Sequence, residues 1–143
     1  MLIGEYVHAV DAKGRLFVPS KFRESLGERF IVTCETGFCL SAYSPEEWAA
    51  FSEKLRALPK TDAVAQAFLR NFSSLACECE LDKQGRILIP QNLREIIKLA
   101  NEAVLIGKLN VMEIWSPATW NGYRQKTSSS FDETLKKMAE WGI

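Results

Sequence analysis

The 143-residue sequence has a single histidine, four cysteines, no long apolar run and no excess of either charge. A membrane-spanning helix needs about 20 consecutive apolar residues, so the lack of such a run argues against a transmembrane segment. The first residues, MLIGE, show neither the basic start nor the apolar stretch of a secretory signal peptide, and we therefore expect a cytoplasmic protein. Because 18 Lys and Arg offset 18 Asp and Glu, binding to nucleic acid has to depend on local basic patches.

Patterns typical of enzymes are also scarce. His8, the only histidine, lies in a strand-like segment without a nucleophile motif beside it. No Gly-x-x-x-x-Gly-Lys phosphate loop occurs. The sequence thus predicts a protein that is not an enzyme and has neither a cofactor nor a small-molecule substrate.

The cysteines are few and their spacing does not favour zinc. A zinc site more often shows Cys-x-x-Cys pairs with supporting histidines, whereas Cys77 and Cys79 are separated by one residue. On a strand, this spacing places both thiols on the same side. We expect these two thiols, together with Cys34 and Cys39, to be reduced, buried and free of metal.

An internal repeat organises the chain. The segment DAKGRLFVP, which begins at Asp11, matches DKQGRILIP, which begins 71 positions later at Asp82. Further on, YSPEEW matches WSPATW at an offset of 72, so one residue has been gained between the two matches. Two copies are too few for a solenoid. They indicate instead a pseudo-dimer that folds from one chain.

Each copy predicts a β-hairpin, a short helix and two further strands. In the first copy, β-prone segments at residues 6–10 and 15–18 flank a turn. Asp11 at the first position of this turn and Gly14 at the fourth suit a type I turn whose glycine has a positive φ. The second copy repeats both turn residues, as Asp82 and Gly85.

Proline, glycine and apolar spacing predict the remaining elements of each copy. Pro19 and Pro90 end the second strand of each hairpin and are expected to open a helix at its first position. Gly27 is expected to end the first of these helices. Closing strands are expected at residues 30–33, 39–43, 103–106 and 111–115.

Between the copies, apolar residues at helical spacing predict two helices. The first helix carries Trp48 and Phe51 and ends at Pro59, and Thr61 is expected to cap the second. The apolar face of the second helix is expected to join the core or a subunit contact and consists of Val64, Phe68, Phe72 and Leu75. After a polar stretch, an amphipathic segment from Phe131 onward is either a docking helix or partly disordered.

Turn geometry does not explain the arginines that follow the two turns, Arg15 and Arg86. On each strand the arginine points away from the aliphatic side chains of the inner face, so we expect it to be exposed. One interpretation is a salt bridge to the turn Asp, which contributes only about 0–1 kcal/mol at a surface. The other interpretation is contact with DNA, and both stay open at this point.

Local charge favours the DNA interpretation. Four cations accompany one acid between residues 8 and 23, and three accompany one acid between residues 82 and 94. Two equivalent basic hairpins suit phosphate contacts and arginine readout of guanine in the major groove, which admits a two-stranded ribbon. The cations concerned are Lys13, Arg15, Lys21, Arg23, Lys83, Arg86 and Arg94.

The repeated motif resembles a known module. Asp-x-x-Gly-Arg, a strand that ends in proline and a short helix with an arginine are similar to AbrB-type swapped-hairpin transcription factors, which carry the module once and dimerise. A doubled module with two intervening helices resembles the MraZ family, and the match covers about residues 1–123.

This resemblance implies a specific fold. We expect the α+β class, with two tandem swapped-hairpin AbrB-like modules that form an intramolecular pseudo-dimeric β-barrel, closed within one chain and flanked by helices. The expected division is a first module at residues 1–52, linker helices at 53–76, a second module at 77–123 and a C-terminal helical tail at 124–143.

The resemblance also implies a function. MraZ proteins are bacterial transcriptional regulators of the division and cell-wall gene cluster; they bind tandem promoter repeats upstream of their own operon, associate with the nucleoid and assemble into rings. The expected partners are therefore double-stranded DNA and further copies of this chain, and no membrane. The residues that match the family's DNA-contacting arginines are Arg15 and Arg86 after the turns and Arg23 and Arg94 on the helices, with Asp11 and Asp82 to orient the hairpins.

The second copy departs from the pattern. Gln84 stands where the first copy has Lys13. Three positions before the turn Asp, where single-module relatives often have a basic residue, the copies have His8 and Cys79. We therefore expect the second copy to bind DNA less well. The alternative function is an antitoxin-like protein-interaction module that binds a partner protein, although the doubled module and the mixed-charge tail favour it less.

Overall fold

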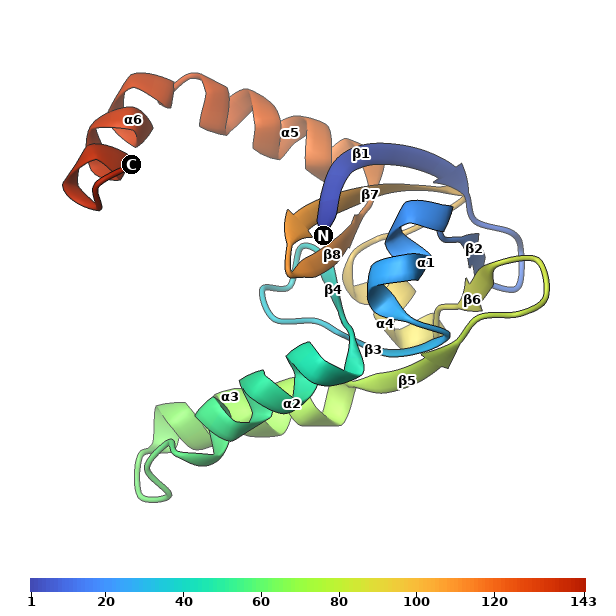
Figure 1. Ribbon diagram of the computed structural model, residues 1–143, viewed down its shortest axis with the longest axis horizontal. Helices are drawn as coiled ribbons and strands as arrows, with labels where there is room; N and C mark the ends of the chain where they lie inside the picture. Colours follow the sequence, from blue (N-terminus) through green and yellow to red (C-terminus); the bar gives the residue numbers. More distant parts are fainter.

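The computed structural model describes residues 1–143 and has a mixed α+β fold (Figure 1). The first half contains β1 (Leu2–Ala9), β2 (Arg15–Phe17), α1 (Ser20–Leu26), β3 (Arg29–Thr33), β4 (Leu40–Tyr43), α2 (Pro45–Arg56) and α3 (Ala63–Leu75). The second half contains β5 (Cys77–Glu80), β6 (Arg86–Leu88), α4 (Gln91–Ile96), β7 (Glu102–Leu109), β8 (Val111–Trp115), α5 (Pro117–Ser128) and α6 (Phe131–Glu140). The order ββαββαα therefore occurs twice, which agrees with the repeat in the sequence.

Strands from the two copies are interleaved. The six-stranded antiparallel sheet has the order β1-β7-β8-β4-β3-β5, in which β1 pairs with β7, β5 with β3, and β4 with β8 across the copies. A separate antiparallel ribbon consists of β2 and β6. At the centre of this ribbon, Leu16 faces Ile87, its own counterpart in the repeat. Equivalent segments of the two copies thus pair with each other in the ribbon, and the main sheet is built from strands of both copies.

Two expectations about the strands are wrong. The segments on either side of the first turn do not form a hairpin ladder with each other, because only one bridge, between Val10 and Leu16, joins them. The six-stranded sheet does not close into a barrel, since β1 and β5 are its two edges and do not pair. Turn residues act locally, whereas the partner of each strand depends on packing against distant parts of the chain.

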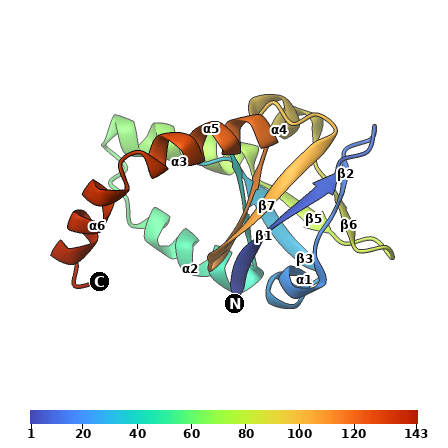
Figure 2. The same ribbon diagram turned by 90° about the horizontal axis from the view of Figure 1, so that it is seen from above.

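One hydrophobic core of 21 buried residues joins the copies. The helices α1 and α4 lie on opposite sides of the strands in Figure 2 and contribute Phe22 and Leu93 to this core. The ribbon contributes the fully buried Leu16 and Ile87 from its inner face. Burial of a side chain of this size contributes about 1.5–3 kcal/mol, so apolar packing holds the ribbon against the body.

The ends of three helices differ from the expectation by one residue. Pro19 and Pro90 are the N-caps of α1 and α4 rather than their first helical residues. Asp62, and not Thr61, caps α3, because its side chain accepts a hydrogen bond from the helix backbone. Gly27 ends α1 with φ of 85°, as predicted.

Two helix pairs, α2–α3 and α5–α6, project from the end of the molecule opposite the β2–β6 ribbon (Figures 1 and 2). Between α2 and α3, the buried ring of Phe72 stacks on Trp48. The expected apolar face of α3 is only partly core, because Val64 is 81% exposed and Phe68 is 36% exposed. The amphipathic segment from Phe131 onward is helical, as α6. No helix combines the length and the apolar character that crossing a membrane requires.

The expected burial of the cysteines is confirmed for three of the four. All four are free thiols; Cys34, Cys39 and Cys79 are buried, and Cys77 is half-buried. The sulfur atoms of Cys77 and Cys79 lie 3.7 Å apart, which confirms that both thiols lie on the same side of β5. Burial raises the pKa of Cys39 to about 12, so this thiol stays protonated at neutral pH.

Candidate nucleic-acid interface

The turn between β1 and β2 is fixed by its own polar groups. The N–H of Gly14 donates to the carbonyl of Asp11 at 2.9 Å, and Gly14 has φ of 92°. The Oδ1 atom of Asp11 accepts hydrogen bonds from the N–H groups of Lys13 (3.0 Å) and Arg15 (2.9 Å). Such bonds are the reason that Asp is favoured at the start of a turn. The turn chemistry predicted from the sequence is confirmed.

The turn between β5 and β6 repeats these bonds. The N–H of Gly85 donates to the carbonyl of Asp82 at 3.0 Å, and Gly85 has φ of 77°. The Oδ1 atom of Asp82 accepts from the N–H groups of Gln84 and Arg86, both at 2.9 Å. The two turns are therefore equivalent in backbone structure and differ in what surrounds them.

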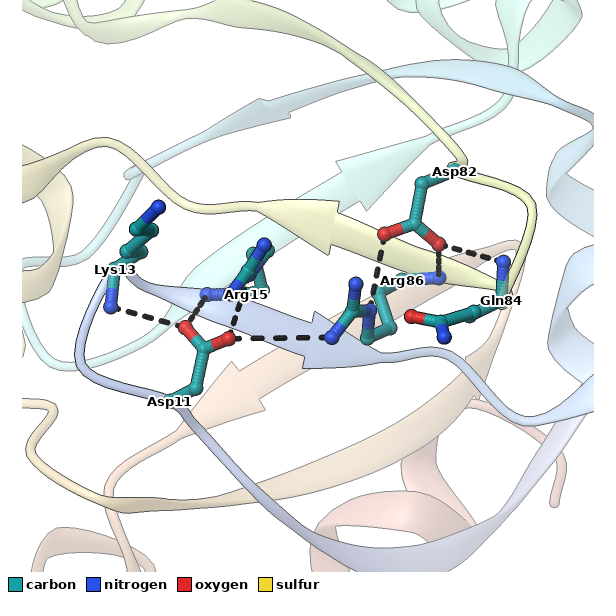
Figure 3. Close-up of polar contacts among 6 residues, drawn as sticks. All are labelled: Asp11, Lys13, Arg15, Asp82, Gln84 and Arg86. Carbon is teal, nitrogen blue, oxygen red and sulfur yellow. Dashed lines mark hydrogen bonds and ion pairs between the residues drawn. The ribbon is translucent and has the colours of Figure 1, made fainter.

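The β2–β6 ribbon brings both turn arginines onto one face. Antiparallel pairing places Arg15 opposite Leu88 and Phe17 opposite Arg86. Leu16, which lies between Arg15 and Phe17, is buried on the inner face, as the alternation of the strand predicts. The outer face thus carries one arginine from each copy of the repeat (Figure 3).

Carboxylates contact both arginines. The Nε atom of Arg15 lies 2.6 Å from Oδ2 of Asp11, and that of Arg86 lies 3.0 Å from Oδ2 of Asp82. Oδ2 of Asp11 also lies 4.0 Å from Nη1 of Arg86, so this carboxylate touches both copies (Figure 3). The salt-bridge interpretation of the sequence is therefore confirmed. The arginine side chains are nevertheless 39% and 30% exposed, and the outer Nη groups of Arg15 have no partner within the chain.

These contacts keep the turn carboxylates ionised. Hydrogen bonds from the backbone and then the side chain of Arg15 lower the pKa of Asp11 from 3.8 to about 2. The backbone N–H of Arg86 is the main cause that lowers the pKa of Asp82, and further hydrogen bonds from Gln84 and the Arg86 side chain add to it. Both carboxylates are thus negatively charged at neutral pH and orient the arginines beside them.

The remaining predicted cations divide into two groups. Lys13, Lys21 and Lys83 are exposed and make no ion pair. The helix arginines, Arg23 and Arg94, are half-buried and lie beside the turn glycines of the opposite copy. The lysines are therefore free to meet a polyanion, whereas the helix arginines contact the protein itself.

Two apolar residues of the outer face were missed by the sequence reasoning. Leu88 is 57% exposed. The ring of Phe17 lies 5.0 Å from the ring of His8, and the guanidinium of Arg23 lies 5.3 Å from its centroid. Strand alternation could have identified them from the sequence, because it places Phe17 and Leu88 on the same side as the turn arginines. No group of three or more His, Cys, Asp or Glu side chains is placed to hold a metal ion.

Comparison with known proteins identifies relatives along the whole chain. The family model described as "MraZ protein, putative antitoxin-like" matches residues 1–71 and 72–140, so it finds the same repeat twice. The chain is 54% identical over 143 residues to the transcriptional regulator MraZ of Caldicellulosiruptor saccharolyticus and 53% identical to that of Alkaliphilus oremlandii, with all of both chains covered. The transcriptional regulator MraZ of Desulfitobacterium hafniense strain DCB-2 is 50% identical over the same length. With both halves matched by the family model and full-length relatives at this level of identity, the chain belongs to the MraZ family.

Proposed function

We propose that this protein is a transcriptional regulator that binds double-stranded DNA through the outer face of the β2–β6 ribbon. The observation that carries the proposal is the placement of Arg15 and Arg86, one from each copy, on one half-exposed face of a two-stranded ribbon. The name of the relatives, transcriptional regulator MraZ, supports the same function. The proposal assigns no catalytic role to the chain.

The chemistry of the ribbon suits the major groove. A two-stranded ribbon fits into this groove, and arginine binds guanine through two hydrogen bonds to O6 and N7. Both ion pairs to the turn carboxylates use Nε, which leaves Nη groups of Arg15 for a base edge. Lys13 and Lys83 are exposed in the turns that lead into the ribbon, and Lys21 is exposed on α1; all three would neutralise phosphates of the bound DNA.

The finer assignment is part of the same proposal. We place the binding site in tandem promoter repeats upstream of the protein's own operon, in the division and cell-wall gene cluster, and we place the protein at the nucleoid as a ring of identical subunits. One chain offers one ribbon of modest charge. A ring multiplies ribbons along tandem sites and raises the effective concentration of each one without any new contact.

Replacement of both ribbon arginines tests the proposal. Arg15→Ala combined with Arg86→Ala should weaken binding to a labelled fragment of the upstream region by about 100-fold or more, since each arginine–guanine contact is worth about 1–3 kcal/mol. Fluorescence anisotropy at several salt concentrations measures this loss. Arg56→Ala is the matched control, because Arg56 also pairs with a carboxylate but lies in α2, at the far end of the molecule. If the double variant binds as tightly as the control, the DNA site is misassigned.

A second function has a specific observation in its favour. The last helix, α6, and the residues after it expose Phe131 (58%), Leu135 (51%) and Trp141 (66%), which is the pattern of a helix that docks on another surface. This exposed face favours an antitoxin-like protein-interaction module. Co-purification with a small partner in fixed stoichiometry, lost when Leu135 and Trp141 are replaced by serine, would support this alternative. Purification of the protein alone, as a homo-oligomer, would count against it.

A further inference from the structure

Each helix arginine lies against the turn of the opposite copy. A Cβ atom built on Gly14 would lie 2.6 Å from Nε of Arg94, which belongs to α4 in the second copy. A Cβ atom built on Gly85 would lie 2.8 Å from Nη1 of Arg23, which belongs to α1 in the first copy. The guanidinium groups therefore pack directly on the two turns, in the space that a Cβ atom would occupy.

Hydrogen bonds connect Arg94 to the first turn. Its Nε donates to the carbonyl of Ile89 at 2.9 Å. The N–H of the same residue, Ile89, donates to the carbonyl of Gly14 at 2.9 Å. Arg94, Ile89 and Gly14 thus form a continuous chain of contacts from α4, through the residue that follows β6, to the turn that precedes Arg15.

The contacts of Arg23 with the second turn are weaker. The backbone bond is equivalent, because the N–H of Val18 donates to the carbonyl of Gly85 at 2.9 Å. The Nε atom of Arg23, however, is buried and has no hydrogen-bond partner. Its guanidinium lies instead over the ring of Phe17, 5.3 Å from the centroid. Arg23 therefore packs on the second turn without the hydrogen bond that anchors Arg94.

We propose that Arg94 and Arg23 are positioning residues that act across the copies, Arg94 through the first turn and Arg15, and Arg23 through the second turn and Arg86. This inference rests on the proposed function and assigns the helix arginines a role other than direct DNA contact. The repeat suggests that each helix arginine acts on the turn of its own copy, but each one contacts the turn of the other copy. We expect Arg94 to have the larger effect on its turn, because Arg94 donates a hydrogen bond there and Arg23 does not.

Lysine distinguishes a positioning role from a phosphate contact. Lysine keeps the positive charge that a phosphate contact requires, but it lacks the planar guanidinium whose Nε–H reaches the Ile89 carbonyl. Under the proposal, Arg94→Lys weakens DNA binding as much as Arg94→Ala, and neither variant changes the slope of log K against log salt. A phosphate contact predicts the opposite, namely rescue by lysine and a slope that falls by about 1 in the alanine variant.

A double-mutant cycle tests the cross-copy assignment. Arg94→Lys is measured by anisotropy at low salt in the wild-type, Arg15→Ala and Arg86→Ala backgrounds. We expect a loss of about 5–10-fold in the wild-type and Arg86→Ala backgrounds and a loss below about 2-fold in the Arg15→Ala background, because residues that act through one another are not additive. Arg23→Lys should show the reverse pattern with a smaller loss. Equal losses of the Arg94 variant in all three backgrounds would overturn the proposal.

A readout without DNA separates this inference from the proposed function. Amide hydrogen exchange of the intact protein is followed by NMR, and the rate at each glycine is compared with its rate in wild type. In Arg94→Lys, exchange should accelerate more at Gly14 than at Gly85. In Arg23→Lys, it should accelerate more at Gly85 than at Gly14. If wild type binds no DNA but this crossed pattern appears, the positioning role stands and the DNA function fails. If exchange rises equally at both turns, or at neither, the positioning role is wrong.

Discussion

The two turns of the ribbon share the same five-residue motif and the same backbone bonds, but their surroundings differ. The carboxylate of Asp11 touches an arginine of each copy, whereas that of Asp82 touches only Arg86. Arg94 is hydrogen-bonded beside the first turn, whereas Arg23 beside the second has a buried Nε without a partner. The comparison shows that a repeated motif does not imply repeated surroundings, since the first turn is held by more contacts than the second.

The largest difference between the turns should appear when their glycines are replaced. At Gly14 a Cβ would lie 2.8 Å from the backbone carbonyl of Ile89 as well as 2.6 Å from Arg94, whereas at Gly85 the closest atoms belong only to the side chain of Arg23. Both glycines have positive φ, so alanine is strained at either position. We expect Gly14→Ala to lower the free energy of unfolding by about 3 kcal/mol and Gly85→Ala by about 1–2 kcal/mol.

Urea unfolding of the two variants measures this difference. Gly122→Ala is the control, because a Cβ there meets no atom within 4 Å and the residue lies in α5. Equal destabilisation at Gly14 and Gly85 would mean that the Ile89 carbonyl moves away without cost. The asymmetry between the turns would then be confined to their charges.

The turns also show what the sequence could and could not predict. Asp11, Gly14 and the inward-facing Leu16 follow from local rules of turn chemistry and strand alternation, and the structure confirms them. The pairing of β1 with β7 and of β2 with β6 was not predicted, because strand partners are chosen by long-range packing. For the same reason, neither the contact of Asp11 with Arg86 nor that of Arg94 with Gly14 had a local signal.

For the helices, the sequence predicted the elements but not which of their apolar residues are buried. Helical spacing predicted α2 and α3 correctly, but it grouped Val64 with Phe72 although only Phe72 is buried. Periodicity shows which residues share a face of a helix and not how much of that face another element covers. The division of the chain at residues 52, 76 and 123 stays a prediction, as does the ring that would cover the exposed faces.

A smaller effect should follow from exchanging the turn cations. Lys13 in the first turn corresponds to Gln84 in the second, and both side chains are exposed. If the ribbon lies in the groove, Lys13→Gln should weaken DNA binding a few-fold and reduce the magnitude of the slope of log K against log salt by about 1. Gln84→Lys should strengthen DNA binding and steepen this slope by similar amounts. Anisotropy titrations at four salt concentrations check both changes. The double variant, which moves the charge from one turn to the other, should restore the wild-type slope, and Lys60→Gln in the α2–α3 loop should leave it unchanged.

The smallest effect concerns the turn carboxylates and appears as a pH dependence. The pKa of Asp11 is about 2 in the folded protein and 3.8 without these contacts, so ionised Asp11 stabilises the fold above about pH 4, and this contribution is lost as the pH falls toward 2. Asp11→Asn keeps the Oδ1 acceptor of the turn but removes the charge that binds the two arginines. Its urea midpoint should therefore lie below that of wild type at pH 7, and the two midpoints should converge between pH 4 and pH 2. Asp82→Asn should show the same sign with a smaller gap, because its carboxylate contacts one arginine only. A gap that is equal for both variants, or constant with pH, would show that the bridging contact of Asp11 with Arg86 adds nothing to the first turn.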